Sequence, residues 1–388
     1  MKISKRISRI EASPTLAITS KAKKMKSEGL DVISFGAGEP DFDTPSLVKE
    51  SIKKALDEGF TKYTPATGTL RLKELVCEKF KKDNGLDYLP ENVVISCGAK
   101  HSIFNIILTL IDSDDEVLIP DPYWVSYPEM VKLAGGKPIS VKCHEENGFR
   151  LTAEEISCKI TSRTKLLIIN SPCNPTGAVY KKEDLEKIAE LCVKKNIIVI
   201  SDEIYEKIIY SPATHVSIAS LNEDIFKQTI VVNGCSKSYS MTGLRIGYIA
   251  GPVEVVKGIS KLQSHSTSNP VSIIMRGLEN SFWVDDEINK MRQAFEKRRD
   301  YIVNRLGDIP GITCNIPEGA FYVFPNIKEL GLGSFEFAEK ILKEKNVAVV
   351  PGKAFGVDEN IRLSYASDEE TIKRGLDRIE EFAKELSK

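Results

Sequence analysis

The sequence lacks an excess of charge of either sign. It contains 54 basic and 55 acidic residues, which leaves a formal net charge of -1 at pH 7. Proteins that bind nucleic acid or anionic membrane surfaces carry a cationic excess. The sequence also has no apolar run near the roughly 20 residues that a membrane-spanning helix requires. We therefore expect neither a nucleic-acid partner nor a membrane protein.

The eight cysteines and four histidines lack the spacing of a metal site or a disulfide framework. The sequence contains no Cys-x-x-Cys pair and no histidine at zinc spacing. Several cysteines stand in aliphatic runs or beside glycines, as is typical of reduced thiols in a cytosolic protein. These patterns predict a cytoplasmic protein without a metal site.

Internal repeats, low-complexity segments and Ser/Gly-rich linkers are also absent from the sequence. A chain of 388 residues is too long for one small core, so we expect two closely packed domains. The basic N-terminal segment has no apolar signal-peptide core, and Ile18, Ala22 and Met25 fall on one helical face before Gly29. This segment is therefore predicted to belong to the fold.

From Val93 onward, short aliphatic runs alternate with helical patterns such as residues 182–195. Continuous apolar runs are typical of strands buried on both faces, which predicts an α/β fold with a mostly parallel sheet flanked by helices. In such sheets ligands bind beyond the carboxyl ends of the strands. The predicted strands are residues 93–96, 117–120, 166–170, 197–202 and 230–233.

The pattern changes beyond Gly251. We predict a long helical stretch from Val271 to Leu306, then a small α+β unit with a helix near residues 335–345. The resulting prediction is a large cofactor-binding domain, residues 46–282, and a small α+β domain built from both chain ends, residues 1–45 and 283–388.

The segment Ile230–Gly251 contains two cations, Lys237 and Arg245, and no carboxylate. A lysine among small residues and apolar walls is a candidate for a lowered pKa and hence for a nucleophilic amine. A surface lysine in a loop is equally compatible with this segment taken alone.

Other unusual residues follow the other predicted strands. Gly98 and Ala99 open an apolar helix whose first N–H groups suit a phosphate, although many α/β loops of this form bind nothing. Asp202 is either a helix cap or a buried charge that needs a cationic partner. Trp124 is either a core aromatic residue or a ring that stacks on a planar ligand.

Two further features lie near the chain ends. Arg362 is flanked by apolar neighbours in the strand-like run 361–364, and its planar guanidinium suits a carboxylate. The Gly- and Pro-rich loop 32–45 is either a connector or a segment whose backbone approaches a ligand.

Together these groups match the requirements of pyridoxal 5'-phosphate (PLP). A lysine forms a Schiff base, a carboxylate keeps the pyridine nitrogen protonated, and polar side chains bind the phenolic oxygen. An indole stacks on the ring, while N–H groups and an arginine hold the phosphate. The sequence therefore predicts a PLP-dependent enzyme.

The segment GCSKSYSMTGLRIG, residues 234–247, resembles the lysine signature of class I aminotransferases. The segments SCGAK, PYWVSYPEM, NSPCNPTG, SDEIYE and NIRLSYA are spaced as in the bacterial aspartate aminotransferase branch of the fold type I enzymes. The resemblance covers nearly the whole chain. It implies a homodimer with shared active sites that transfers an amino group between L-aspartate and 2-oxoglutarate, giving oxaloacetate and L-glutamate.

The resemblance also implies a role for each matched residue. Lys237 would form the Schiff base and move a proton at the substrate α-carbon, and Asp202 would pair with the pyridine nitrogen. Arg362 would bind the substrate α-carboxylate with help from the Gly38 backbone, and Tyr63 would reach the phosphate in the neighbouring subunit. The other implied contacts are Tyr205 and Asn174 at the phenolic oxygen, Trp124 on the ring face, Gly98, Ala99, Lys100, Ser236 and Arg245 at the phosphate, and Trp124 and Asn174 toward the substrate.

Substrate choice depends on Lys100, which follows the phosphate-loop glycine pair as in the bacterial branch. An unpaired cation in a dry site is costly, so Lys100 favours a dicarboxylic substrate. Members that use prephenate carry a basic residue near the N-terminus, where this sequence has Glu11 or a neighbour. Aminotransferases of aromatic, alanine or prephenate specificity, and a PLP-dependent C–S lyase, remain alternatives at this point.

Overall fold

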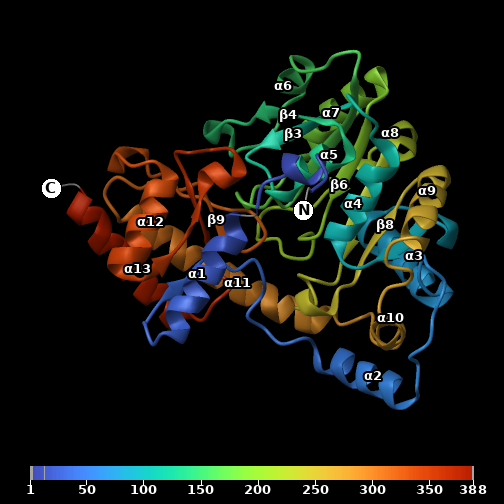
Figure 1. Cartoon of the computed structure of the whole chain (residues 1–388), viewed down its shortest axis with the longest axis horizontal. Coiled ribbons are helices and arrows are strands. Elements are labelled where there is room, and N and C mark those ends of the chain that lie inside the picture. Colours follow the sequence, from blue (N-terminus) through green and yellow to red (C-terminus); the bar gives the residue numbers. More distant parts are fainter. Residues whose placement is uncertain (1–2, 13, 387–388) are drawn as a thin grey trace.

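A seven-stranded sheet organises the larger part of the molecule in this computed structural model, which describes residues 3–12 and 14–386 (Figure 1). The strand order is β2-β8-β7-β6-β5-β3-β4. Strand β8 runs antiparallel to both of its neighbours, and the other pairs are parallel. The strands are β2 (Val93–Ser96), β3 (Glu116–Asp121), β4 (Lys137–Lys142), β5 (Thr164–Asn170), β6 (Ile198–Asp202), β7 (Thr229–Gly234) and β8 (Gly247–Ala250).

The five aliphatic runs identified in the sequence all form strands of this sheet, so the predicted α/β class is confirmed. Successive residues of a strand face opposite sides of the sheet. In β5, Leu166 and Ile168 therefore pack on one side, and Leu167 and Ile169 pack on the other. Strand β4 was not predicted, because it lies at the sheet edge and most of its side chains are exposed or only half-buried.

Helices cover both faces of the sheet. The core on one face includes apolar side chains of α4, α5 and α9, and the core on the other face includes side chains of α6, α7 and α8. A third cluster packs α3 and α10 against β2 and β8. The bounds are α2 (Ser46–Asp57), α3 (Leu70–Asn84), α4 (Ala99–Leu110), α5 (Ser126–Ala134), α6 (Ala153–Ser157), α7 (Lys182–Lys195), α8 (Glu223–Gln228), α9 (Val253–Ser264) and α10 (Ser272–Glu279).

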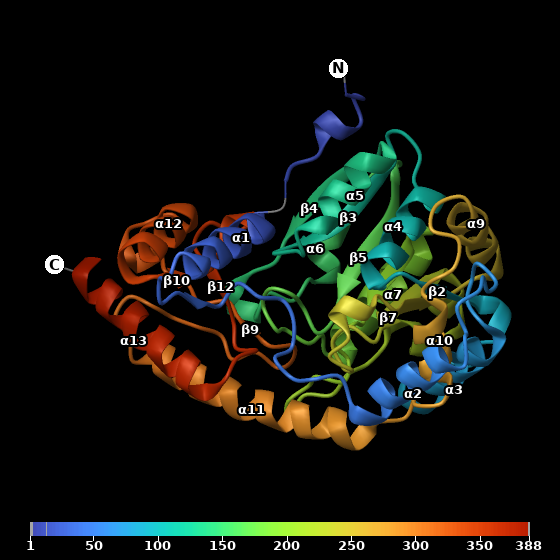
Figure 2. The same cartoon turned by 60° about the horizontal axis from the view of Figure 1, so that its bottom comes forward.

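A smaller unit combines the two ends of the chain, and Figure 2 shows α1 (blue) beside α12 (orange). Strand β1 pairs in parallel with β10, and β11, β12 and β9 form an antiparallel sheet. The predicted helical face of Ile18, Ala22 and Met25 packs near Leu342, which confirms that the N-terminal segment belongs to the fold. The bounds are α1 (Pro14–Ser27), β1 (Ile33–Ser34), β9 (Tyr322–Val323), α12 (Ser334–Lys345), β10 (Val347–Ala348), β11 (Val350–Pro351), β12 (Ile361–Ser364) and α13 (Glu369–Leu386).

The prediction of one long helix from Val271 to Leu306 is wrong. The segment forms two helices, α10 and α11 (Asp285–Gly307). Between them Phe282 is buried, and its carbonyl accepts a hydrogen bond from the Tyr239 hydroxyl instead of from a helical N–H. Burial of Phe282 against the sheet unit thus interrupts a pattern that is helical on both sides.

Helix α11 connects the two units, and Figure 2 shows it running from beside α10 toward α13. Ile288 in its second turn belongs to the core of the sheet unit, whereas Met291 and the later apolar residues belong to the core of the smaller unit. We therefore propose that the chain forms a large domain, residues 46–282, and a small domain, residues 1–45 and 283–388.

The remaining helices are short. They are η1 (Ile7–Arg9), η2 (Pro90–Asn92), η3 (Glu145–Asn147), η4 (Ile218–Ser220), η5 (Thr242–Leu244), η6 (Lys328–Leu330) and η7 (Gly352–Phe355).

None of the helices within residues 3–12 and 14–386 is both long enough and apolar enough to span a bilayer.

Candidate functional site

A cavity of about 670 Å³ lies beyond the carboxyl ends of the parallel strands. The loops after β3, β5, β6 and β7 and the start of α4 line one side, and α1, the loop 34–39 and β12 line the other. Since parallel strands end at the same edge of a sheet, groups far apart in the sequence meet there. The predicted site residues that line this cavity are Gly38, Ala99, Lys100, Trp124, Asn174, Asp202, Tyr205, Ser236, Lys237, Arg245 and Arg362.

Two predicted site residues do not line the cavity. Gly98 lies directly behind Arg245, as described below. Tyr63 is 90% exposed and stands outside the cavity of its own chain. This position is compatible with the prediction that Tyr63 serves a neighbouring subunit.

Lys237 lies in the turn that follows β7, and its amine faces the cavity. The Nζ atom donates a hydrogen bond to the Gly38 carbonyl oxygen and lies 5.8 Å from the centroid of the Tyr205 ring. Burial, with the nearby charges of Arg362 and Arg245, lowers the pKa of Lys237 to about 8. The amine is therefore neutral far more often than an ordinary lysine, as a nucleophile or a general base requires.

Asp202 ends β6, and its side chain is almost completely buried. The Tyr127 hydroxyl donates to its Oδ2 atom at 2.6 Å, and the Ile204 N–H donates to Oδ1 at 3.3 Å. Burial raises the pKa of Asp202 to about 6, although the Tyr127 and Ile204 hydrogen bonds oppose that rise. A buried carboxylate of this kind gains most from a cationic partner inside the cavity.

Tyr205 is fully enclosed beside Asp202, and its hydroxyl lies 2.9 Å from the hydroxyl of Tyr322. Burial raises the pKa of Tyr205 well above its ordinary value, so the hydroxyl stays protonated. The phenol is consequently available as a hydrogen-bond donor to a ligand in the cavity.

Arg362 lies on β12 and is buried, with its Nη1 donating to Asn174 Oδ1 at 3.0 Å and its Nη2 donating to the Gly36 carbonyl at 2.9 Å. The guanidinium also stacks 4.5 Å from the centroid of the Tyr322 ring. Its buried Nε atom makes no hydrogen bond in the part of the chain that the structure describes. An incoming carboxylate would bring both a charge and an acceptor to this guanidinium.

Arg245 and the start of α4 form the opposite end of the cavity. Arg245 Nη1 donates to the Thr242 carbonyl at 2.7 Å, and its Nη2 donates to the Cys97 carbonyl at 3.1 Å. Gly98 has φ +88°, and a Cβ atom built there would lie 2.2 Å from Arg245 Nη2. The first N–H groups of α4 have no intrahelical acceptor, so this end of the cavity suits a phosphate.

Lys100 follows in the first turn of α4, and its Nζ atom lies 4.8 Å from the centroid of the Trp124 ring. Partial burial and the charge of Arg245 lower the pKa of Lys100. The Trp124 ring also packs edge-on against Tyr127, with ring centroids 5.2 Å apart. Trp124 therefore lies between the Lys100 amine and the residue that binds Asp202.

The chemistry of these residues fits PLP. Four cations line the cavity and form no ion pair with a carboxylate in residues 3–12 and 14–386, namely Lys100, Lys237, Arg245 and Arg362. Asp202 is the buried acid of this cavity. A ligand with several negative groups and one ring cation would satisfy both the cations and the acid. Arg362, whose Nε atom has no hydrogen-bond partner among the described residues, and the start of α4 are two places that suit anionic groups.

Three side chains at the site were not among the predicted site residues. Tyr127 binds Asp202, and Tyr322 contacts both Tyr205 and Arg362. Asn170 donates to the Asp202 carbonyl at 2.9 Å and accepts from the Asn174 N–H at 2.9 Å. Tyr127 and Asn170 lie inside the motifs PYWVSYPEM and NSPCNPTG, whereas Tyr322 lies outside the motifs noted in the sequence. Buried aromatic residues and turn asparagines are so common that the sequence pattern alone does not single them out.

Comparisons with known proteins agree with this geometry. A family model described as aminotransferase class I and II matches residues 30–379. The aspartate aminotransferase of Bacillus subtilis (strain 168) is 47% identical over 393 residues, with 100% of each chain covered. The probable aspartate/prephenate aminotransferase of Aquifex aeolicus (strain VF5) is 48% identical over 392 residues, with 99% of each chain covered.

A solved structure is similar over nearly the same length. The crystal structure of the aspartate aminotransferase from Rhizobium meliloti matches with a TM-score of 0.95 at 40% identity, covering 99% of both chains.

Proposed function

This chain belongs to the class I and II aminotransferases, PLP-dependent enzymes of fold type I, and on that premise we propose that it transfers an amino group between L-aspartate and 2-oxoglutarate. The products are oxaloacetate and L-glutamate, which is the reaction of EC 2.6.1.1. The observation that carries the choice of substrate is that two cations, Arg362 and Lys100, line one cavity without a carboxylate partner among the described residues. A dicarboxylic substrate supplies one carboxylate for each.

PLP is the cofactor, and when bound it supplies an electron sink for the carbanion that forms at the substrate α-carbon. We propose Lys237 as its attachment point, because its amine has a lowered pKa and faces the cavity. The residues proposed to hold the cofactor are Asp202 at the ring nitrogen, Tyr205 and Asn174 at the phenolic oxygen, Trp124 on the ring face and, at the phosphate, the backbone of Gly98, Ala99 and Lys100 together with Ser236 and Arg245.

Proton transfer at the substrate α-carbon is proposed for the same lysine. Once the substrate amine has displaced it from the cofactor, the Lys237 Nζ atom would take a proton from the substrate α-carbon and deliver it to the cofactor carbon that receives the amino group, and a pKa of about 8 suits both transfers at neutral pH. Arg362 orients the substrate by binding the α-carboxylate, and the Gly38 backbone lies on the same side of the cavity. Asn174 and Trp124 line the same cavity and are proposed to contact the substrate as well.

A homodimer with shared active sites is part of this proposal. Tyr63 is 90% exposed and does not line the cavity of its own chain, which supports a role at a neighbouring subunit. Leu47, Leu56 and Leu70, on the adjoining helices α2 and α3, are each more than half exposed, and a subunit interface would bury such side chains. We also propose a cytoplasmic location, because all eight cysteines are free thiols.

Use of prephenate is a second candidate activity, since a relative at 48% identity carries that substrate in its name. In this chain Glu11 is exposed, and its backbone N–H donates to the Glu129 carboxylate at 2.8 Å. An acidic side chain at this place does not supply the basic group that members using prephenate carry there. We therefore expect prephenate to be a poorer amino acceptor than 2-oxoglutarate.

Relative rates over a panel of amino donors test the proposed substrate. Wild type, with 2-oxoglutarate as acceptor, is expected to prefer aspartate over alanine and phenylalanine. Lys100→Ser should reduce kcat/KM for aspartate about 30-fold, because a hydrogen bond between charged groups contributes about 2 kcal/mol. The same change should affect the rates with alanine and phenylalanine little. The matched control is Lys132→Ser, which removes a lysine paired with Glu129.

Three results of these assays would redirect the proposal. Equal losses for all three donors in Lys100→Ser would assign the side-chain site elsewhere. With aspartate as the amino donor, equal rates for prephenate and 2-oxoglutarate as acceptors would favour the second candidate activity. Pyruvate and ammonia released from cysteine without a keto acid would indicate a C–S lyase.

A further inference from the structure

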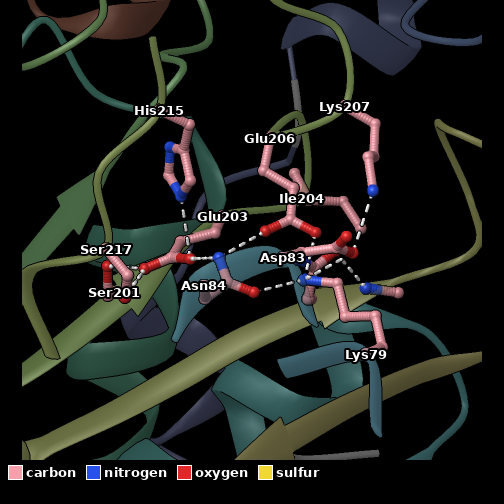
Figure 3. Close-up of polar contacts among 12 residues, drawn as sticks. Lys79, Asp83, Asn84, Ser201, Glu203, Ile204, Glu206, Lys207, His215 and Ser217 are labelled. Atoms are coloured by element: carbon pink, nitrogen blue, oxygen red, sulfur yellow. Dashed lines mark hydrogen bonds and ion pairs between the residues drawn. The ribbon is translucent and has the colours of Figure 1, made fainter. Parts of the chain in front are cut away.

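A cluster of charged and polar side chains gathers around Glu203, Glu206 and His215 (Figure 3). Glu203 and Glu206 belong to the segment 202–206, which also carries Asp202 and Tyr205. Within this segment Asp202 and Tyr205 line the cavity, whereas Glu203 and Glu206 point away from it. Glu203 is completely buried, and the mechanism proposed above does not use it.

Glu203 is surrounded by donors. The hydroxyl groups of Ser201 and Ser217 donate to Oε1 at 2.8 and 2.6 Å, and the Asn84 amide donates to Oε2 at 3.4 Å. His215 Nε2 lies 2.9 Å from the same Oε2 atom. Both oxygens are therefore occupied, so this arrangement is a hydrogen-bonded network and not an open metal site.

Charge balance within the cluster depends on His215. Lys79 forms an ion pair with Glu206, and Lys207 forms one with Asp83 at 2.9 Å. These pairs leave the Glu203 carboxylate with His215 as its cationic partner. A buried carboxylate without such a partner is strongly unfavourable, so the structure favours the protonated ring.

Two acids and one base act on the pKa of His215 in opposite directions, and the acids dominate. Burial by itself would lower the pKa of His215, but Glu203 and Glu206 outweigh burial and the charge of Lys79, and the pKa lies above its ordinary value. The buried Nδ1 atom makes no hydrogen bond within the described part of the chain. A neutral His215 ring protonated at Nε2 and an imidazolium can both donate this hydrogen bond to Glu203. The two protonation states of the ring therefore differ mainly in charge.

The cluster reaches the cavity through Asp202, the residue next to Glu203. The charge of Glu203 raises the pKa of Asp202 and so disfavours its ionised form. A cation on His215 offsets that charge. Loss of the cation would leave Glu203 uncompensated and would make Asp202 a weaker partner for a ring cation in the cavity.

We propose that His215 is a positioning residue for the reaction, because its positive charge neutralises Glu203 from behind and thereby keeps Asp202 ionised toward the ring nitrogen of the cofactor. This inference rests on the proposed function. His215 acts through Glu203 and Asp202 and has no contact with the substrate.

A measurement on the wild-type protein tests the charge directly. The cofactor-free protein, labelled at histidine Cε1, contains four histidines, and the signal absent from His215→Gln identifies the ring. We expect an imidazolium signal for His215 at pH 7. A neutral His215 ring at pH 7 would overturn the inference. If His215→Gln does not fold, single substitutions of the other three histidines assign the signals, and the measurement on the wild type stays decisive.

Cofactor affinity tests the connection to Asp202. Cofactor-free wild type, His215→Gln and the double variant Glu203→Gln with His215→Gln are titrated with PLP and with its 1-deaza analogue, which lacks the ring nitrogen. The first variant keeps a donor for Glu203 but loses the charge, and the second loses both charges. His144→Gln is the matched control, since His144 faces Glu155 at 3.6 Å on the surface.

At pH 5, where Asp202 is mostly protonated, we expect His215→Gln to weaken PLP binding about tenfold, because raising the pKa of Asp202 by about one unit lowers its ionised fraction about tenfold there. Binding of the 1-deaza analogue should change less than about twofold, and the double variant should regain most of the affinity for PLP. Equal weakening for both ligands, or no recovery in the double variant, would show a merely structural role and overturn the inference. Failure of the wild type to bind PLP would instead overturn the proposed function.

Discussion

Replacing Lys237 by methionine should make the stability of the cofactor-free protein depend less on pH. In the folded protein burial, with Arg362 and Arg245, lowers the pKa of Lys237 from 10.5 to about 8. The difference corresponds to about 3 kcal/mol, because one pKa unit is worth about 1.4 kcal/mol. The amine lies in an open cavity, so solvent screening reduces the expected effect to about 2 kcal/mol.

The direction of the effect follows from proton binding. Between pH 8 and pH 10.5 the unfolded chain holds more protons at Lys237 than the folded chain does, so the free energy of unfolding rises with pH in that window. Methionine has no proton to bind. The difference in unfolding free energy, wild type minus Lys237→Met, should therefore increase by about 2 kcal/mol between pH 7 and pH 10.5.

Urea unfolding at several pH values measures this difference. The protein must be free of cofactor, which would consume the amine, and all samples need the same protein concentration, because a subunit interface makes stability depend on it. Lys257→Met, on the exposed side of α9, is the control and should show no such rise. A difference that stays within about 0.5 kcal/mol, or falls with pH, would refute the argument that burial and neighbouring cations lower the pKa of Lys237.

Four further variants test individual contacts. Lys237→Ala should retain the fold, seen by circular dichroism, and lose all but a trace of transamination; substantial remaining activity would remove Lys237 from its proposed role. Tyr127→Phe removes a hydrogen bond of 2.6 Å to Asp202 and should weaken PLP binding about tenfold in a fluorescence titration; unchanged affinity would contradict this support. Arg362→Lys should raise KM for aspartate about tenfold or more, because lysine cannot reproduce the planar contact, and steady-state kinetics with an unaltered KM would assign the α-carboxylate to another group. Gly98→Ala places a Cβ atom 2.2 Å from Arg245 Nη2 at φ +88° and should weaken binding of PLP more than that of pyridoxal, which has no phosphate; equal effects on the two ligands would contradict the phosphate role.

Much of the sheet was predictable because buried parallel strands have an uninterrupted apolar composition. That signal located β2, β3, β5, β6 and β7 within one or two residues. It failed for β4, whose side chains are mostly exposed, and it could not detect the break between α10 and α11, where burial of Phe282 in the sheet unit overrides a helical pattern.

Most of the candidate site was also anticipated, because its residues stand directly after those strands or inside long motifs. Eleven of the predicted residues line one cavity. Tyr63 is exposed, which is compatible with its predicted role at a second subunit. Their binding roles stay predictions. The partners that tune them, Tyr127 for Asp202 and Tyr322 for Arg362, required the three-dimensional arrangement.

The sequence by itself determined the class of fold and the chemistry available at the strand ends. Residue type, periodicity and motif spacing are local properties, and they are sufficient to identify a lysine, an acid and two arginines as the groups of interest. Only the tertiary structure decided their state. The pKa of Lys237 is low because its amine is buried and because Arg362, from a distant part of the chain, lies near it. Asp202 accepts a hydrogen bond from Tyr127, and the neighbouring Glu203 is paired with His215. Those effects depend on distance and burial, which a linear sequence does not record.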